Sequence, residues 1–179
     1  NGLVLHTVLE THAHADHMSA AMWLKQRCDA SIGIGSGIKA IQQHFAPLYG
    51  MAPESADVTS YFDFLVEDGD ALTVGALSIK CMHVPGHTPA CMAYAIGDAV
   101  FVGDTLFMPD SGTARCDFPG GSASALFESV QKLLAMPADT RLFVCHDYQP
   151  NGRELSYVAT IGEHREANIH INDGSTQKE

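Results

Sequence analysis

The chain has 179 residues, of which 46% are hydrophobic and 17% charged, and it carries a formal net charge of −11 at pH 7. These values favour one folded domain with a buried core and exclude a disordered chain. The negative charge argues against nucleic acid as a partner, because phosphate binding depends on clustered Lys and Arg. The sequence has no apolar run long enough to span a bilayer and no pattern typical of a signal peptide, so we expect no membrane partner and a cytoplasmic protein.

Cysteine usage agrees with a reducing compartment. The chain has five cysteines, an odd number, and none forms a Cys-x-x-Cys pair. Neither a disulfide framework nor a zinc ribbon is therefore expected.

Apolar periodicity predicts a mixture of helices and strands. The predicted elements, in chain order, are a strand over 3–9, a helix over 18–27, a strand over 31–35, a helix over 38–45, a strand-rich segment over 61–96, a strand over 99–102, a helix over 122–134, a strand ending near 144 and a helix over 162–169. The helix over 122–134 has the clearest apolar face, and Ser122 is its expected N-cap.

A dense set of polar residues follows the first predicted strand. His12, His14, Asp16 and His17 lie within six positions of one another. Imidazole and carboxylate together suit zinc or iron, whereas calcium or magnesium would require oxygen ligands. Alternate residues of an extended loop point the same way, so His12 and His14 can share one target. The alternative is that these are solvated loop residues, with Asp16 capping the next helix.

Three further polar residues follow later strands. His87 comes after a Pro-Gly turn, Asp104 follows the strand over 99–102, and His146 follows the strand that ends near 144. Loops after strands converge on one edge of a sheet, so these residues are expected to meet the first group. The sequence therefore predicts a transition-metal site.

In this order, the seven residues resemble the metallo-beta-lactamase superfamily over most of the chain. The resemblance implies an α/β (α+β) fold, an αββα sandwich of two mixed sheets with helices outside. We expect one such domain over 1–171, incomplete at its N-terminus and lacking some terminal elements, followed by a polar tail over 172–179. Unpaired strand edges would then favour a homodimer.

Smaller motifs narrow the resemblance to the persulfide dioxygenase (sulfur dioxygenase) branch. They are the segments 85–91, 102–107, 112–121, 145–148 and 151–153, and the Arg-x-Asp-Phe stretch from Arg115 is the most discriminating. This branch implies oxidation of glutathione persulfide by dioxygen and water to sulfite and glutathione, with a functional link to a rhodanese.

The same branch implies one Fe(II) per chain with His14, His87 and Asp104 as its ligands. Two histidines and one carboxylate leave three positions open on octahedral iron. The remaining residues would orient these ligands or bind a second metal, and they are His12, Asp16, His17 and His146.

Arg115, Asp117 and Tyr148 are the expected substrate-side residues. An Arg fork matches a glutathione carboxylate, and a Tyr hydroxyl next to His146 can hydrogen-bond the substrate. The alternative for Arg115 is an ion pair with Asp117 inside the protein, and both interactions can hold.

The other enzyme considered is a dinuclear zinc hydrolase of glutathione thioesters, as in glyoxalase II, or another hydrolase of this fold. His12, His14 and His87 would hold one zinc, Asp16, His17 and His146 the second, and Asp104 would bridge them. The sequence lacks a basic C-terminal helical region for glutathione, which argues against this hydrolase. A non-catalytic metal-binding or sulfide-sensing module is a third interpretation, which the complete set of seven site residues disfavours.

Overall fold

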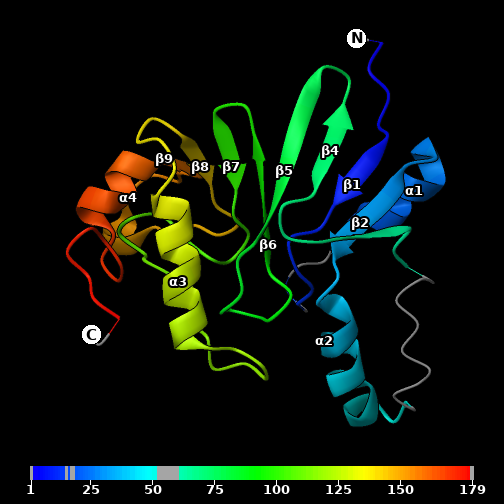
Figure 1. Ribbon diagram of the computed structural model, residues 1–179, viewed down its shortest axis with the longest axis horizontal. Helices are drawn as coiled ribbons and strands as arrows, with labels where there is room; N and C mark the ends of the chain where they lie inside the picture. The colour runs from blue at the N-terminus through cyan, green and yellow to red at the C-terminus, as the bar shows by residue number, and fades with distance from the viewer. Residues whose placement is uncertain (1, 15, 17–18, 52–60, 178–179) are drawn as a thin grey trace.

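Two β-sheets form the centre of the molecule (Figure 1). The computed structural model describes residues 2–14, 16, 19–51 and 61–177. The smaller sheet is parallel, and its strands are β1 (Thr7–Leu9), β2 (Ser31–Gly35) and β3 (Phe64–Val66) in that order. The larger sheet has the order β4 (Ala71–Val74), β5 (Leu77–His83), β6 (Met92–Ile96), β7 (Ala99–Phe101), β8 (Arg141–Phe143) and β9 (Val158–Thr160). Only β7 and β8 pair in parallel in this sheet.

Helices lie on the outer sides of both sheets (Figure 1). The α-helices are α1 (Ala21–Cys28), α2 (Ile38–Phe45), α3 (Ala123–Leu134) and α4 (Ile161–Ala167), and short 3-10 turns occur at η1 (Ala46–Tyr49) and η4 (Pro150–Gly152). In Figure 1, α1 and α2 accompany the three-stranded sheet, while α3 crosses in front of the six-stranded sheet and α4 lies beside β9.

The alternation of side chains along the strands builds the layers. On β5, Cys81 packs between the two sheets with Val66 of β3, whereas the next residue, Met82, packs against α3. On β6, Tyr94 likewise packs in the cluster between the two sheets, and Ala93 packs in the cluster on the α3 side. Successive residues of a strand point to opposite faces of a sheet, so β5 and β6 each contribute side chains to two hydrophobic clusters.

A third cluster covers the outer face of the smaller sheet. Ile34 of β2 is buried against Ile38 of α2, with Leu65 of β3 packed beside them. The order of layers is therefore helix, sheet, sheet, helix, and the expected αββα sandwich is confirmed.

Most predicted elements occur where the sequence places them. The strand over 31–35 and the helix over 38–45 have the expected bounds. Helix α3 begins after Ser122, whose Oγ accepts a hydrogen bond from the backbone N–H of Ala125 at 3.2 Å. This N-cap explains why the helix starts directly after Ser122.

The first strand is shorter than predicted, because β1 begins only at Thr7. Its partner β2 begins at Ser31, directly after the turn in which Asp29 ends α1 with a φ of +55°. The left-handed residue turns the chain, so no earlier strand residue is available for pairing. Helix α1 also starts later than predicted, and its N-cap is Ala20 rather than Asp16.

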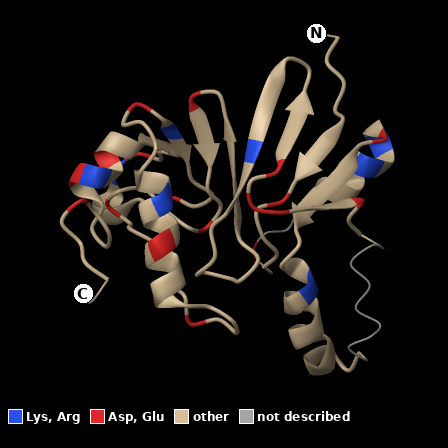
Figure 2. Cartoon of the chain, viewed as in Figure 1, with Lys and Arg blue, Asp and Glu red and all other residues tan. Residues whose placement is uncertain are grey.

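Charged residues are spread over separate elements (Figure 2). Lys and Arg occur on all four α-helices and on β5 and β8. Across the described ranges, no helix combines the length and the apolar character that a membrane crossing requires.

The described part of the predicted polar tail packs against the domain. Gln177 donates a hydrogen bond from Nε2 to Ser124 Oγ at 2.7 Å, and the backbone N–H of Asp173 bonds the carbonyl of Arg165 at 3.1 Å. The tail therefore contacts both α3 and α4.

Candidate metal centre

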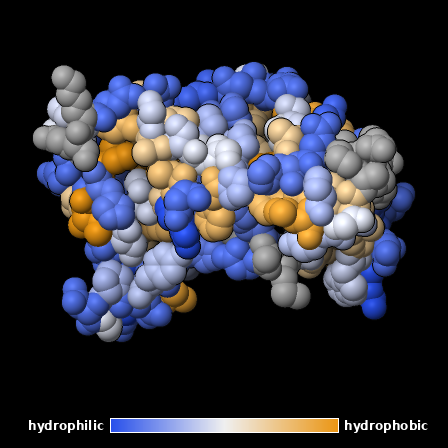
Figure 3. Space-filling view, turned by 90° about the horizontal axis from the view of Figure 1, so that it is seen from below, coloured by the Kyte–Doolittle hydropathy of each residue, from blue (hydrophilic) through white to orange (hydrophobic). Residues whose placement is uncertain are grey.

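The loops that follow β1, β5, β7 and β8 carry the predicted site residues. These strands run toward the lower edge of the sheets in Figure 1, where the loop between β5 and β6 is visible. Figure 3 views the molecule from this side and shows hydrophobic patches across the middle of the face, flanked by hydrophilic residues. The polar loop residues that follow strands of both sheets therefore lie at one edge of the sandwich.

Three histidines form the centre of the site. His12, His14 and His87 each offer one ring nitrogen, and these nitrogens all lie within 4.8 Å of one another. His87 Nε2 is 3.0 Å from His14 Nδ1. His12 and His87 are buried, and His14 is half-buried. The first and second histidine motifs of the sequence therefore meet, as predicted.

Asp104 joins this cluster from the loop after β7. Its Oδ2 lies 3.7 Å from His12 Nε2 and 3.6 Å from His87 Nε2, and its side chain is buried. Zinc-bound histidine nitrogens lie about 2.0–2.1 Å from the metal, which places two such ligands ~3–4 Å apart. The observed separations and the chemistry of the donors fit one borderline divalent ion.

Neighbouring groups fix the orientation of the histidine rings. His87 Nδ1 lies 2.7 Å from the carbonyl oxygen of Arg115, which can only accept a hydrogen bond. The proton of a neutral His87 is therefore on Nδ1, and the lone pair of Nε2 faces the cluster. Thr11 Oγ1 lies 3.2 Å from His12 Nδ1. The ring of Phe118 packs against both His14 and His87, with centroids 4.5 and 5.3 Å away.

A second group of ligand-type residues adjoins the first. His146 Nε2 is 3.5 Å from Asp104 Oδ1 and 3.7 Å from Asp16 Oδ2. Asp104 therefore directs one oxygen toward His12 and His87 and the other toward His146. His17, the remaining predicted member of this group, lies outside the described residues.

Tyr148 stands beside His146. The two rings stack with centroids 6.0 Å apart and planes 20° apart, and Phe107 contacts both of them edge to face. Partial burial raises the pKa of the Tyr148 hydroxyl, and the charges of Asp104 and Asp16 add to this shift. The hydroxyl is therefore protonated at neutral pH and is available as a hydrogen-bond donor.

Arg115 makes the intramolecular contact that the sequence offered as an alternative to substrate binding. Its Nε and Nη2 both donate to the Asp117 carboxylate at 2.6 Å. The side chains of Arg115 and Asp117 are 67% and 64% exposed, and the guanidinium lies 4.8 Å from the Phe118 ring centroid. This exposed pair lies at the border of the site, and its contact with a substrate stays a prediction.

An apolar cavity of about 330 Å³ lies beside His12 and His14. Its other walls include Ile32 and Ile34 of β2, Ile38 of α2 and Met22 of α1, and the charged residue Glu10 also lines it.

Sequence reasoning missed three contributors to this region. Phe107, Phe118 and Arg153 all belong to the stretches that carry the resemblance, but none of them was given a role in the site. Aromatic contacts between loops far apart in sequence depend on the fold, so no local pattern could have shown that Phe107 contacts His146 and Tyr148.

The chain is similar to known proteins in sequence and in fold. The sequence profile of the metallo-beta-lactamase superfamily matches residues 1–146. A "probable metallo-hydrolase" of Burkholderia pseudomallei is 51% identical over 95% of this chain and 61% of its own length. The human mitochondrial persulfide dioxygenase ETHE1 is 30% identical over 95% of this chain and 58% of its own length. The crystal structure of ETHE1 from Myxococcus xanthus aligns with a TM-score of 0.76 at 30% identity, covering 99% of this chain and 67% of that one. The chain thus spans about three fifths of the length of these two curated relatives.

Proposed function

The chain belongs to the metallo-beta-lactamase superfamily, and from this premise we propose that it is a mononuclear non-heme iron persulfide dioxygenase. The reaction would convert glutathione persulfide, dioxygen and water to glutathione and sulfite. The observation that carries the proposal is the contact of Asp104 with His12 and His87, at 3.7 and 3.6 Å, in one buried cluster. Two histidines and one carboxylate are the ligand set typical of iron(II) oxygenases.

The ligands of the proposed iron are His87, Asp104 and one histidine of the first motif. The sequence favours His14 for the third position. The Asp104 contact instead favours His12, which is also the more buried of the two. Iron held by such a triad would supply adjacent open positions for dioxygen and for the sulfur of the substrate.

The protein residues around the triad have separate tasks. The carbonyl of Arg115 holds the His87 ring, and His146 contacts the Asp104 oxygen that faces away from His12. Both interactions orient ligands and raise their basicity. We assign glutathione recognition to Arg115 and Tyr148, because both are exposed at the border of the cluster. For Arg115 this requires the guanidinium to share its donors between Asp117 and a substrate carboxylate.

Parallel metal and activity assays test the proposal. Protein loaded with iron and protein loaded with zinc are each given glutathione persulfide and a glutathione thioester. The proposal predicts persulfide-dependent oxygen consumption with iron only and no thioester hydrolysis with either metal. Hydrolysis of the thioester by the zinc form, without oxygen consumption by the iron form, would reject it.

Variants of the two first-motif histidines identify the third ligand. His12→Ala should lower the iron bound per chain to the level of Asp104→Ala, while His14→Ala retains iron with impaired turnover. His44→Ala is the matched control, because His44 lies exposed on α2 outside the site. The opposite result for His12 and His14 would restore the assignment made from sequence.

A dinuclear zinc hydrolase is the second candidate, and one observation favours it. The two oxygens of Asp104 face two different groups, His12 with His87 and His146 with Asp16. A carboxylate so placed can bridge two metals. In that enzyme, His146→Ala would remove about half of the bound zinc, whereas in the iron enzyme it would leave the iron content unchanged.

A further inference from the structure

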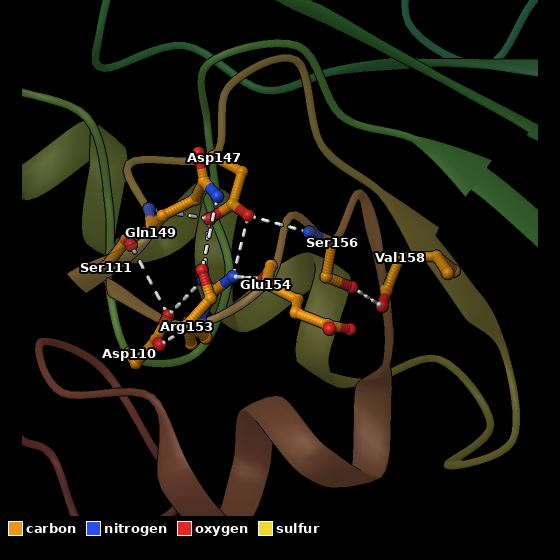
Figure 4. A network of polar contacts seen from close by, with 8 residues as sticks. All are labelled: Asp110, Ser111, Asp147, Gln149, Arg153, Glu154, Ser156 and Val158. Carbon is orange, nitrogen blue, oxygen red and sulfur yellow. Dashed lines mark hydrogen bonds and ion pairs between the residues drawn. The ribbon is translucent and has the colours of Figure 1, made fainter. Parts of the chain in front are cut away.

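An ion-pair network joins Arg153 to Asp110 and to Asp147, the residue between His146 and Tyr148 in the sequence (Figure 4). Arg153 donates from Nη1 and Nη2 to the two carboxylate oxygens of Asp147, at 2.6 and 2.5 Å. It also donates from Nε and Nη2 to the carboxylate of Asp110, at 2.5 and 2.8 Å. One guanidinium thus joins the loop after β7, which carries Asp110, to the loop after β8, which carries Asp147 and Arg153. Asp110 and Arg153 are 43 residues apart in the sequence.

Asp147 is the buried end of this network. Its side chain is only 2% exposed, and it also accepts hydrogen bonds from the backbone N–H groups of Ser156 and Gln149, at 2.8 and 3.2 Å. The Arg153 guanidinium holds the pKa of Asp147 well below its usual range. A buried carboxylate with four such donors has a fixed position, and removal of the cation leaves its charge uncompensated.

The loop after β7 and the loop after β8 also contact each other on the side of the metal centre. Asp147 lies between His146 and Tyr148 in the sequence, and Phe107, three residues before Asp110, contacts the rings of both. The guanidinium and the aromatic contacts therefore connect the same two loops at two points.

The backbone of the His146 loop needs such support. Gln149 has a φ of +48°, which is unfavourable for a residue of its type, whereas Asn151, with a φ of +58°, is of a type that tolerates this region. A conformation of this kind persists only when the surrounding contacts determine it. The network provides contacts on both sides of this segment, at Asp147 and at Ser156.

We propose that Arg153 is a positioning residue, whose guanidinium fork fixes the loop of His146 and Tyr148 against the loop of Phe107 and Asp110. It holds His146 beside Asp104 and holds Tyr148 at the border of the site. The catalytic part of this inference rests on the proposed function, whereas the structural part concerns the two loops alone.

Arg141 provides a matched control. It makes a similar two-point pair with Asp98, with both bonds at 2.9 Å, but the pair joins β8 to the turn before β7 and both side chains are at least half exposed. Exposed pairs of this kind contribute little to stability. Arg141→Ala therefore removes an equivalent surface contact away from the His146 loop.

Amide hydrogen exchange tests the structural part without any substrate. Arg153→Ala should accelerate exchange in residues 145–156 and leave the central strands β5 and β6 at wild-type rates, and Arg141→Ala should leave the His146 loop unchanged. Wild-type exchange at 145–156 in Arg153→Ala would overturn the proposal. Faster exchange throughout the chain would also overturn it, because Arg153 would then support the whole fold rather than this loop.

Chemical rescue tests the catalytic part. Turnover of Arg153→Ala should fall ~10–100-fold, the loss expected when a site group is misplaced by about 1 Å. Iron content should stay at the wild-type level. Guanidinium ion at low millimolar concentration should restore part of the activity to Arg153→Ala and have no such effect on Arg141→Ala or wild type. Arg153→Lys should remain impaired, since an ammonium group cannot bind two carboxylates through a planar fork.

Failure of this inference and failure of the proposed function give different results. Wild-type protein without dioxygenase activity would reject the function, and the exchange data would still decide whether Arg153 fixes the loop. Normal turnover in Arg153→Ala, with an active wild type, would reject the positioning role alone.

Discussion

Replacement of Gly86 by Ala is expected to disturb both the fold and the metal centre. Gly86 has a φ of +142°, and a Cβ atom there would lie 2.3 Å from Leu126 Cα and 2.4 Å from Leu126 N. Its carbonyl oxygen accepts a hydrogen bond from the N–H of Ser122 at 2.9 Å, and the next residue is His87. The glycine therefore lets the histidine loop pass directly against the first turn of α3.

The size of the effect follows from two contributions. The unfavourable φ costs about 1–3 kcal/mol for a residue with a Cβ, and insertion of a methyl group into a packed contact adds about 1–3 kcal/mol. Gly86→Ala should thus lower the free energy of unfolding by about 2–6 kcal/mol, a large part of the ~5–15 kcal/mol typical of a domain. Because the loop must move away from α3, iron bound per chain should also fall.

Gly97→Ala separates the two contributions. Gly97 has a φ of +59°, and a Cβ atom there would meet no atom within 4 Å. This variant should lose only about 1–2 kcal/mol and keep its metal. Urea unfolding and metal analysis of both variants provide the comparison. Equal losses of stability, or unchanged iron in Gly86→Ala, would refute the argument that close contact with α3 positions His87.

Three further predictions concern caps, pH and metal. Ser122→Ala should lower the free energy of unfolding by about 1 kcal/mol in urea titrations, because Ser122 caps α3. Burial lowers the pKa of His164 to about 4 from 6.5, so the unfolded chain takes up a proton first as the pH falls. Its contribution to stability is complete above pH 6.5 and is lost progressively toward pH 4, by about 3 kcal/mol. His164→Gln should remove this part of the pH dependence in unfolding titrations, and an unchanged slope would contradict the assignment. A chelator should lower the Tm of metal-loaded wild type but leave the Tm of Asp104→Ala unchanged, since bound metal stabilises only the folded state.

Residue patterns predict several elements well, whereas the order of the layers was expected only from the resemblance to the superfamily. Apolar alternation and a clear N-cap predict β2, α2 and α3 close to their observed bounds. The start of β1 could not be predicted, because it depends on where β2 begins as a partner rather than on the apolar residues 3–6.

The meeting of the site residues was predictable in part. His12, His87 and Asp104 follow strand ends, and such loops share one edge of the sandwich. The choice between His12 and His14 beside Asp104 depends on distances of a few ångströms, which spacing in an extended loop does not determine. The pairing of Asp110 with Arg153 joins residues 43 positions apart, and only the packing of two loops brings them together.

The central claim is tested most directly by the ratio of oxygen consumed to sulfite formed when the iron-loaded protein is given glutathione persulfide. Glutathione persulfide, one dioxygen and one water balance to glutathione, sulfite and two protons, so we expect one oxygen consumed for each sulfite released. Oxygen consumption without sulfite, or no consumption by protein that holds its iron, would contradict the assignment as a persulfide dioxygenase.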